Sequence, residues 1–207
     1  IRVYVYEDLD YHPGGHRNGL FKKIISIAER YSIATADLVV SVSFNLARLR
    51  MKQTARRVVL SSNGAESIVF RKALNKRPHP PTMIYVGAIE ELFGLDLSVL
   101  AIREISKTIP DVRLLIAGTG SYEKDMRKRV AEAKLEKHIV FLGRVPHWKL
   151  PELMSGADVG LEFFSQNDLM HYACPIKIFE YMAAGLPVIA ADSSETGRIV
   201  KLRNVGK

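Results

Sequence analysis

The chain has 207 residues, of which 47% are hydrophobic and 25% charged, and its formal net charge is +8. This is the composition of a globular protein, and no apolar run approaches the roughly 18 residues that a membrane-spanning helix needs. The single cysteine, Cys174, excludes a disulfide within the chain and favours a reducing compartment, which predicts a cytoplasmic location.

The positive charge is concentrated in the first part of the chain. Residues 1–77 contain 14 Lys and Arg against 6 Asp and Glu, whereas residues 78–207 contain 16 of each. This asymmetry suggests two domains with different partners, although a solvated charged face is the alternative. A basic surface attracts nucleic acid, anionic lipid or phosphorylated substrates, but no RNA-binding signature or zinc-ligand spacing is present, and we expect no nucleic-acid partner.

The first part of the chain reads as a short α/β segment. Strands are expected at residues 2–6, 38–43 and 57–61, and helices at 19–30 and 44–52. The run NKRPHPPT (75–82), with three prolines in four residues, predicts a linker between domains of residues 1–77 and 78–207. Three strands and two helices are fewer than a doubly wound domain usually has, so we expect an incomplete first domain with further residues upstream.

The second part of the chain alternates strands and helices regularly. Strands are expected at residues 83–87, 112–118, 138–143, 158–164 and 187–191, and helices at 95–109, 121–135, 147–155 and 175–184. The strands are apolar throughout, which is typical of a parallel sheet that helices cover on both faces. With right-handed crossovers, the pattern predicts an α/β fold with a doubly wound domain.

The strand-to-helix loops form the candidate site, because ligands of such sheets bind outside the carboxyl ends of the strands. The loop GTGSYE (118–123) has two glycines, Gly118 and Gly120, which allow close backbone approach, and the amides that follow can meet an anion. The third glycine of a dinucleotide fingerprint is absent, which disfavours a Rossmann dehydrogenase. A tight turn without a ligand is the alternative.

Lys177 and Glu180 are the charged residues of an otherwise apolar or small-residue run, CPIKIFEYMAAGLPVIA (174–190). Because they are three residues apart, they lie on one face of the predicted helix near its N-terminus. A lysine at this positively polarised end is unfavourable unless an anion is near, and a carboxylate suits a vicinal diol such as ribose. The pair therefore suggests a nucleoside diphosphate, with a surface ion pair as the alternative.

Five segments together resemble the GT-B glycosyltransferases, especially family 4 and its relatives (glycosyl transferases group 1). They are PIKIFEYMAAGLPVI (175–189), SNGAE (62–66), YVGAIEELFGLDL (85–97), LLIAGTGSYEKDM (114–126) and VFLGRVPHWKLPELMSGADVGL (140–161). The resemblance implies the GT-B fold, with two Rossmann-like domains: residues 1–77 on the acceptor side and residues 78–207 binding the donor. It implies a metal-independent hexosyltransferase of polysaccharide biosynthesis that moves a sugar from a nucleotide-diphosphate sugar to a saccharide or lipid-linked acceptor and needs no cofactor.

The resemblance also assigns donor-binding residues, which are Gly87, Gly118, Gly120, Arg144, Val145, Lys177 and Glu180. Glu180 corresponds to the glutamate that binds ribose, and Arg144 and Val145 lie beside the base. Gly87 approaches the diphosphate.

The chain departs from the family pattern at three positions. Ala88 and Phe93 replace an arginine and a lysine that neutralise the diphosphate, and Tyr172 replaces the first of two paired glutamates. Some branches carry a lysine in a P-x-K-x-x-E segment, as this chain does. In such a branch, Lys177 takes over the charge of the diphosphate.

An acidic turn after the first strand, YEDLDYH (6–12), supplies candidate bases for the acceptor hydroxyl. The corresponding loop of GT-B relatives often holds an acceptor-side His or Asp, which implies Asp10 as the first choice and Asp8 as the second. A solvated acidic turn is the alternative, and the two histidines of HPGGH (12–16) are only a weak metal signal. Because the acceptor domain is expected to be incomplete, we predict that residues 1–207 alone transfer no sugar efficiently.

Two other functions are compatible with the sequence. Ala88 and Phe93 favour a non-catalytic nucleotide-sugar-binding protein, and a GT-B-fold epimerase would act on the nucleotide sugar itself. Many acceptors of this fold are lipid-linked sugars at the inner membrane face, so the basic excess suggests peripheral docking of the first domain on anionic lipid. The residues of this basic set are Lys22, Lys23, Arg30, Arg48, Arg50, Lys52, Arg56 and Arg57.

Overall fold

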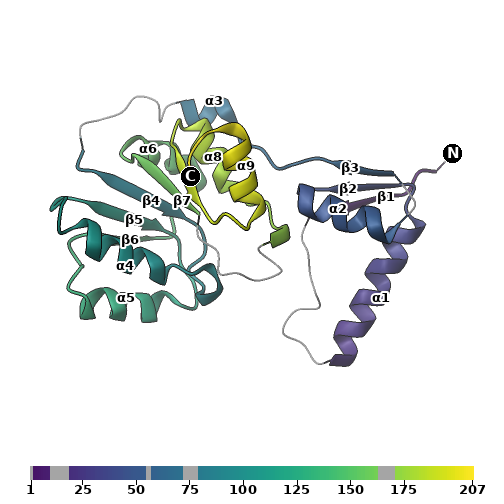
Figure 1. Cartoon of the computed structure of the whole chain (residues 1–207), viewed down its shortest axis with the longest axis horizontal. Coiled ribbons are helices and arrows are strands. Elements are labelled where there is room, and N and C mark those ends of the chain that lie inside the picture. Colours follow the sequence, from purple (N-terminus) through teal and green to yellow (C-terminus); the bar gives the residue numbers. More distant parts are fainter. Residues whose placement is uncertain (1, 10–18, 55–56, 72–78, 163–170) are drawn as a thin grey trace. The chain divides into compact units, whose positions relative to one another are not determined.

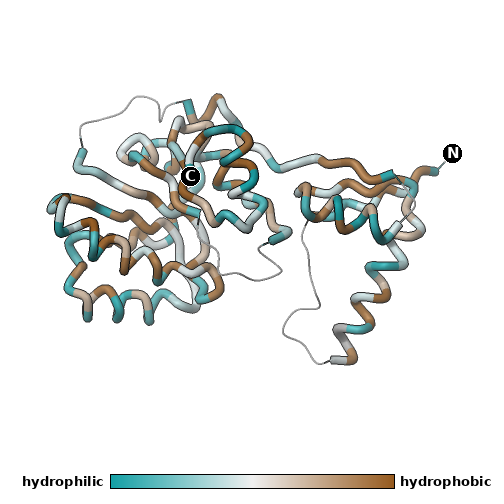
Figure 2. Tube along the Cα trace, in the orientation of Figure 1, coloured by the Kyte–Doolittle hydropathy of each residue, from teal (hydrophilic) through white to brown (hydrophobic). Residues whose placement is uncertain are grey.

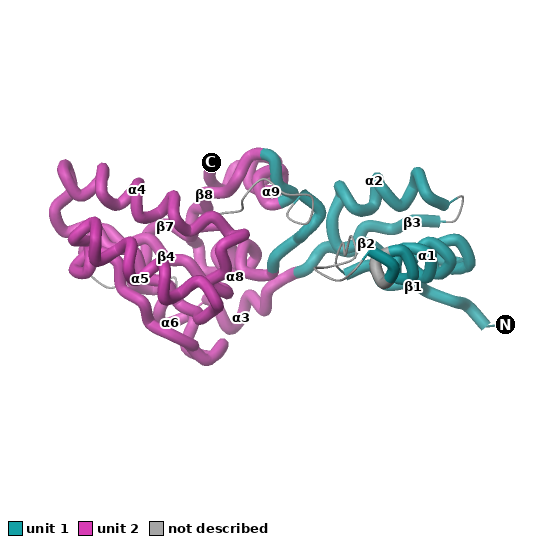
Figure 3. Tube along the Cα trace, turned by 90° about the horizontal axis from the view of Figure 1, so that it is seen from below, with its two compact units in different colours: residues 1–63, 166–175, 193–195 teal, residues 64–165, 176–192, 196–207 magenta. Residues whose placement is uncertain are grey.

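The computed structural model describes residues 2–9, 19–54, 57–71, 79–162 and 171–207. It is an α/β protein with parallel strands, which confirms the predicted class (Figure 1). The chain divides into two compact units, which Figure 3 shows in different colours. Unit 1 consists of residues 1–63, 166–175 and 193–195, and unit 2 of residues 64–165, 176–192 and 196–207.

Unit 1 contains a parallel three-stranded sheet in the order β1-β2-β3. Its elements are β1 (Val5–Asp8), α1 (Gly19–Thr35), β2 (Leu38–Ser41), α2 (Phe44–Gln53) and β3 (Arg57–Leu60). The described residues up to Leu60 thus have the three strands and two helices that the sequence predicts. Ile33, Ala36 and Val39 are buried together and join α1 to the sheet.

Unit 2 contains a parallel five-stranded sheet in the order β6-β5-β4-β7-β8. Its strands are β4 (Thr82–Val86), β5 (Arg113–Ala117), β6 (Ile139–Gly143), β7 (Val159–Glu162) and β8 (Val188–Ala190). The chain builds the sheet from β4 through β5 to β6, and then places β7 on the other side of β4. The order therefore reverses between β4 and β7, and the carboxyl ends of these strands are where doubly wound sheets bind ligands.

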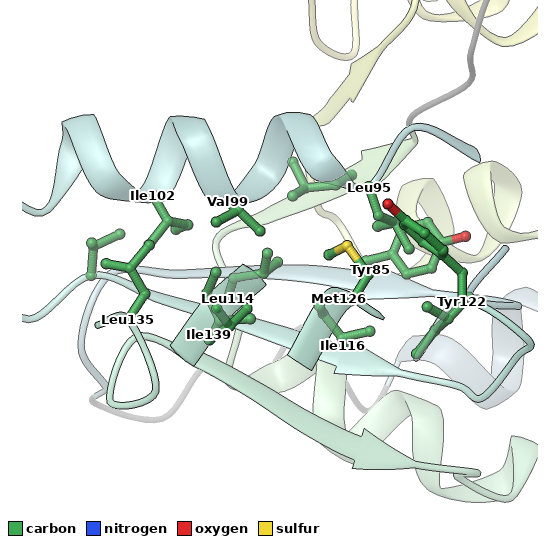
Figure 4. Packing of buried hydrophobic residues seen from close by; sticks show 14 residues of the cluster. Tyr85, Leu95, Val99, Ile102, Leu114, Ile116, Tyr122, Met126, Leu135 and Ile139 are labelled. Atoms are coloured by element: carbon green, nitrogen blue, oxygen red, sulfur yellow. The ribbon is translucent and has the colours of Figure 1, made fainter. Parts of the chain in front are cut away.

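Helices cover both faces of this sheet because its strands are apolar on both sides. Ile84 and Tyr85 are neighbours in β4, and both are fully buried, but they belong to different hydrophobic clusters. The cluster around Tyr85 joins the sheet to α4 (Asp96–Ile105) and α5 (Glu123–Glu132), and Figure 4 shows its packing. The cluster around Ile84 joins the sheet to α3 (Ser67–Phe70), α6 (Leu150–Ser155), α8 (Lys177–Ala183) and α9 (Glu195–Arg203).

The division between the two units lies upstream of the boundary that the prolines suggest. Gly64 already belongs to unit 2, and Phe70 of α3 is fully buried in the second cluster. Burying a phenylalanine side chain contributes about 2–3 kcal/mol, which ties α3 to unit 2. Residues 75–78 of the proline-rich run lie outside the described residues.

Helix α8 is shorter than the predicted helix at residues 175–184, and a glycine ends it. Gly185 has a φ of +69°, in the left-handed region, and its N–H donates to the carbonyl of Met182. The N–H of Leu186 donates to the carbonyl of Tyr181 over 2.9 Å. This is a Schellman motif, and it turns the chain from α8 directly into β8.

Candidate functional site

Three loops at the carboxyl ends of β4, β5 and β6 are held together by backbone hydrogen bonds. The N–H of Gly87 donates to the carbonyl of Ala117, and the N–H of Gly118 donates to the carbonyl of Gly143. Farther along, the N–H of Ile89 donates to the carbonyl of Thr119. The loops therefore form one connected rim on unit 2.

Gly118 and Gly120 have a packing reason to be glycine. A Cβ atom at Gly118 would lie 1.8 Å from the carbonyl oxygen of Gly87, and one at Gly120 would lie 2.1 Å from that of Ile89. Gly118 also has a φ of +156°. Close approach between the loops thus requires these glycines without any ligand, and their role toward a donor stays a prediction.

Lys177 extends from the start of α8 to the end of β4. Its Nζ would be 2.9 Å from a Cβ atom at Gly87, and it lies 4.5 Å from the centroid of the Tyr85 ring. The same Nζ lies 5.8 Å from the ring centroid of Phe93, which belongs to a 3-10 turn, η2 (Glu91–Phe93). The ammonium therefore lies beside the loop after β4, at the switch point of the sheet.

The carboxylate of Glu162 faces this ammonium from the end of β7. Its Oε2 lies 3.1 Å from Nζ of Lys177, and its side chain is 0% exposed, against 13% for Lys177. Burial raises the pKa of Glu162 from 4.5 to about 7, although the charge and hydrogen bond of Lys177 lower it. Glu162 was not predicted from the sequence, where its signal is an acid at the carboxyl end of an apolar strand.

Glu180 lies one helical turn after Lys177 and has a different partner. Its Oε1 lies 2.7 Å from Nε2 of His147, which belongs to η3 (His147–Lys149) in the loop after β6. Glu180 is buried, whereas the His147 side chain is 65% exposed. The His147 and Phe70 rings form a T-shaped pair with 5.8 Å between their centroids. His147 was not predicted from the sequence either, because a lone histidine carries no signal of its partner.

The predicted residues beside the base lie in the same loop as His147. Arg144 is exposed, and Val145 is half-buried and packs against the second hydrophobic cluster. The loop after β6 therefore joins Arg144, Val145 and the partner of Glu180 within four residues of sequence.

Of the two candidate bases, only Asp8 belongs to the described residues. Asp10 lies outside the described residues. Asp8 is 2% exposed, and its carboxylate accepts from Nε and Nη2 of Arg50 over 2.7 and 3.0 Å and from the hydroxyl of Ser41. A carboxylate that is buried and held in this way is not positioned to take a proton from an acceptor, so its geometry argues against the role suggested for Asp8.

The ion pair with Asp8 also removes Arg50 from the basic set proposed for lipid docking. Arg50 is buried and bonds to Asp8 and Glu29, so its charge is not available to a membrane. Burial alone would lower the pKa of Arg50, but the hydrogen bond and charge of Asp8 outweigh it, and the pKa is raised. Arg56 lies outside the described residues.

Comparisons with known proteins agree on one group of enzymes. Residues 67–206 match the protein family described as "Glycosyl transferases group 1". The chain is 34% identical over 110 residues to 2-deoxystreptamine glucosyltransferase of Streptomyces kanamyceticus, covering 53% of this chain and 27% of that protein. It is 27% identical over 171 residues to phosphatidyl-myo-inositol mannosyltransferase of Mycobacterium tuberculosis, covering 81% of this chain and 43% of that protein.

A solved structure has the same fold. HepE of Anabaena, in complex with UDP-glucose, matches with a TM-score of 0.73 and 19% identity, over 96% of this chain and 56% of HepE. This likeness confirms the predicted GT-B type of fold. The chain spans less than half the length of the two curated relatives and just over half of HepE.

Proposed function

Because the chain belongs to the glycosyl transferases group 1 family, we propose that unit 2 binds a nucleotide-diphosphate sugar. We further propose that the whole protein transfers its sugar to a hydroxyl of a saccharide or lipid-linked acceptor. Residues 1–63 then belong to the acceptor side and unit 2 to the donor side.

The position of Lys177 is the observation that carries this proposal. Its ammonium lies beside Gly87 at the carboxyl end of β4, with Glu180 one turn later on the same helix. A cation at this point can bind the diphosphate and stabilise the charge that develops on it as the sugar departs. The carboxylate of Glu180 can accept hydrogen bonds from the ribose hydroxyls, while His147 holds its Oε1.

The position of Phe93 supports the proposal that Lys177 supplies the charge of the family's usual lysine. Phe93 stands where the resemblance expects that lysine, and Nζ of Lys177 lies 5.8 Å from its ring. The cation thus reaches the same neighbourhood from α8 instead of from the loop after β4. Charge on the diphosphate needs a counter-charge, but it does not need one from a particular element.

We also propose that transfer needs no metal and that Asp10 is the acceptor-side base. Among the described residues, no three His, Cys, Asp or Glu side chains gather as a metal site would require. Asp10 is preferred because Arg50 engages Asp8. Mutation of Asp10 to Asn in the whole protein should lower kcat and leave donor affinity unchanged.

A non-catalytic donor-binding protein is the second candidate. The engagement of Asp8 with Arg50 favours it, because this removes one of the two candidate bases. Donor binding by the whole protein without turnover across a panel of acceptors would support this candidate. A change of the sugar without acceptor would instead identify an epimerase.

Calorimetric titration with UDP-glucose tests donor binding, since this is the nucleotide sugar bound by HepE. Lys177→Met and Glu180→Gln should each weaken binding at least about tenfold, which corresponds to about 1.4 kcal/mol. Lys128→Met is the matched control, because Lys128 is an exposed lysine of α5 paired with Glu132. Equal affinities of the Lys177, Glu180 and Lys128 variants would refute the proposed site.

The acceptor side of the proposal includes a membrane surface. Leu20, Ile24, Ile27 and Tyr31 are exposed on α1 at spacings of four, three and four residues, which places them on one face. Hydrophobic and hydrophilic stretches alternate along α1 in Figure 2. Lys23 and Arg30 on the same helix are exposed, so α1 has the composition of an interfacial helix that binds anionic lipid. Within the described ranges, no helix combines the length and apolar character needed to cross a bilayer.

A further inference from the structure

A buried acid lies behind the proposed donor cation. The side chain of Glu162 is fully buried at the end of β7, and within the described part of the chain neither of its oxygens accepts a well-aligned hydrogen bond. A carboxylate in such a place is costly unless it is paired or takes a proton. An apolar residue would fill the position without this cost, so the acid calls for a functional explanation.

Among the described residues, the side chains of Tyr85, Tyr181 and Lys177 interact electrostatically with Glu162. The hydroxyl of Tyr85, from β4, donates to the carbonyl of Ala88 over 2.8 Å, and the hydroxyl of Tyr181, from α8, accepts from the N–H of Val86 over 2.9 Å. Both tyrosines are therefore engaged with the backbone. The third group is the ammonium of Lys177, whose Nζ lies 3.1 Å from Oε2 of Glu162.

We propose that Glu162 is a positioning residue that holds Lys177 beside Gly87 and takes up a proton when a donor diphosphate engages the ammonium. This rests on the proposed donor site. The proton comes from solvent and goes to the carboxylate of Glu162, and no bond to the donor is formed or broken. The Glu162 carboxylate and the diphosphate thus compete for one cation. Protonation of Glu162 neutralises its carboxylate and leaves the ammonium of Lys177 to the diphosphate.

The balance of charges gives the direction of this exchange. The ammonium stabilises the ionised carboxylate, while burial favours the neutral form, and the two effects leave the pKa of Glu162 at about 7. Negative phosphates near Nζ oppose the ionised carboxylate, so the pKa rises further when the donor binds. Burial raises the pKa values of Tyr85 and Tyr181, which therefore stay neutral through this range.

Calorimetry of the chain with UDP-glucose tests the proton uptake. Titrations between about pH 6 and about pH 8, in buffers of different ionisation enthalpy, measure the protons taken up, because the diphosphate of this donor does not titrate there. We expect uptake of up to one proton, and a Kd that rises by as much as about tenfold per pH unit above the pKa of free Glu162. Glu162→Gln should abolish both effects.

Two control variants separate other sources of protons. Glu104→Gln removes a carboxylate paired with Lys107 at the surface, and it should leave proton uptake unchanged. His147→Gln removes the titratable partner of Glu180, and whatever its Kd for the donor, the number of protons taken up per donor bound should be unchanged. Binding of UDP-glucose with no proton uptake, or with equal uptake in Glu162→Gln, would overturn the inference and leave the donor site intact.

A measurement on the free protein keeps the inference testable if UDP-glucose does not bind, an outcome that would count against the proposed function. The carboxyl ¹³C resonance of Glu162, assigned with Glu162→Gln, should titrate near pH 7. It should move to higher pH in Lys177→Met, because this variant lacks the ammonium that stabilises the ionised form. Titration in the ordinary range of glutamate, or no shift in Lys177→Met, would contradict the role of Glu162.

Discussion

Asp8 and Arg50 form a buried ion pair that joins β1 to α2 in unit 1. The carboxylate accepts from two guanidinium nitrogens, and both side chains are almost inaccessible to solvent. Removal of one partner from such a pair leaves the other charge buried and uncompensated. The pair therefore has a structural role, whatever the catalytic role of Asp10.

Asp8→Asn should destabilise the chain by about 3 kcal/mol, because Arg50 loses its counter-charge. Urea unfolding monitored by circular dichroism measures this change. Asp111→Asn alters an exposed carboxylate and should change the free energy of unfolding by less than about 0.5 kcal/mol. Equal stability of these two variants would show that the Asp8–Arg50 pair contributes nothing.

Glu162 should make the stability of the chain depend on pH. Since its pKa in the folded state is raised from 4.5 to about 7, its contribution is fully present below about pH 4.5 and is lost as the pH rises through about 7. Between about pH 5 and about pH 8, the wild type should lose about 2–3 kcal/mol more than Glu162→Gln. Urea unfolding of both proteins at the two pH values measures this difference. An equal loss of unfolding free energy in the two proteins would contradict the prediction.

At the scale of elements, the loops after β4, β5 and β6 depend on close contacts between backbones. Gly118→Ala should cost about 2 kcal/mol or more, because its Cβ would overlap the carbonyl oxygen of Gly87. Gly64→Ala is the matched control, since nothing lies within 4 Å of the added Cβ there. Thermal unfolding compares the two variants. A similar Tm for both would show that the loops after β4 and β5 can move apart to accommodate the added methyl group.

The strands could be predicted from the sequence because most of them are short, largely apolar runs ended by glycine or polar residues. The bounds differ by a few residues, as for β1, which begins at Val5 instead of residue 2. Helices α3 and α9 were not predicted, since Ser67–Phe70 is a single turn and Glu195–Arg203 is mostly polar. Tertiary packing of Phe70 and Val200 stabilises these helices, and the local pattern of apolar residues in the sequence does not reveal this packing.

The candidate site was predictable to the extent that its chemistry lies within one segment. Lys177 and Glu180 lie on one helix, so their spacing was visible in the sequence. Their partners, Glu162 and His147, are distant in sequence and depend on the strand order. Glycine at positions 118 and 120 can be explained by close packing of the loops or by close approach of a ligand. The sequence alone does not distinguish these two reasons.

At the scale of the whole molecule, the excess positive charge and the apolar face of α1 predict binding to anionic vesicles. The chain should float with vesicles rich in phosphatidylglycerol and not with vesicles of phosphatidylcholine alone. The double variant Ile24→Glu/Ile27→Glu should abolish flotation. The control Leu97→Glu/Leu100→Glu alters two exposed apolar residues of α4 at the same spacing and should float normally. Absence of flotation for the unaltered chain would contradict the proposed contact between this face of α1 and a membrane.

Neither compact unit is a continuous stretch of chain, because residues 166–175 and 193–195 return to unit 1 after unit 2 has begun. A gene truncated after residue 63 would therefore express unit 1 without two of its segments, including Glu195, whose carboxylate accepts from the N–H groups of Phe44 and Asn45 at the start of α2. The complementary fragment would carry those segments without their partner. Excision at the proline-rich run is thus a poor route to separate the two units, whereas mixing the two fragments offers an assay of their reassociation.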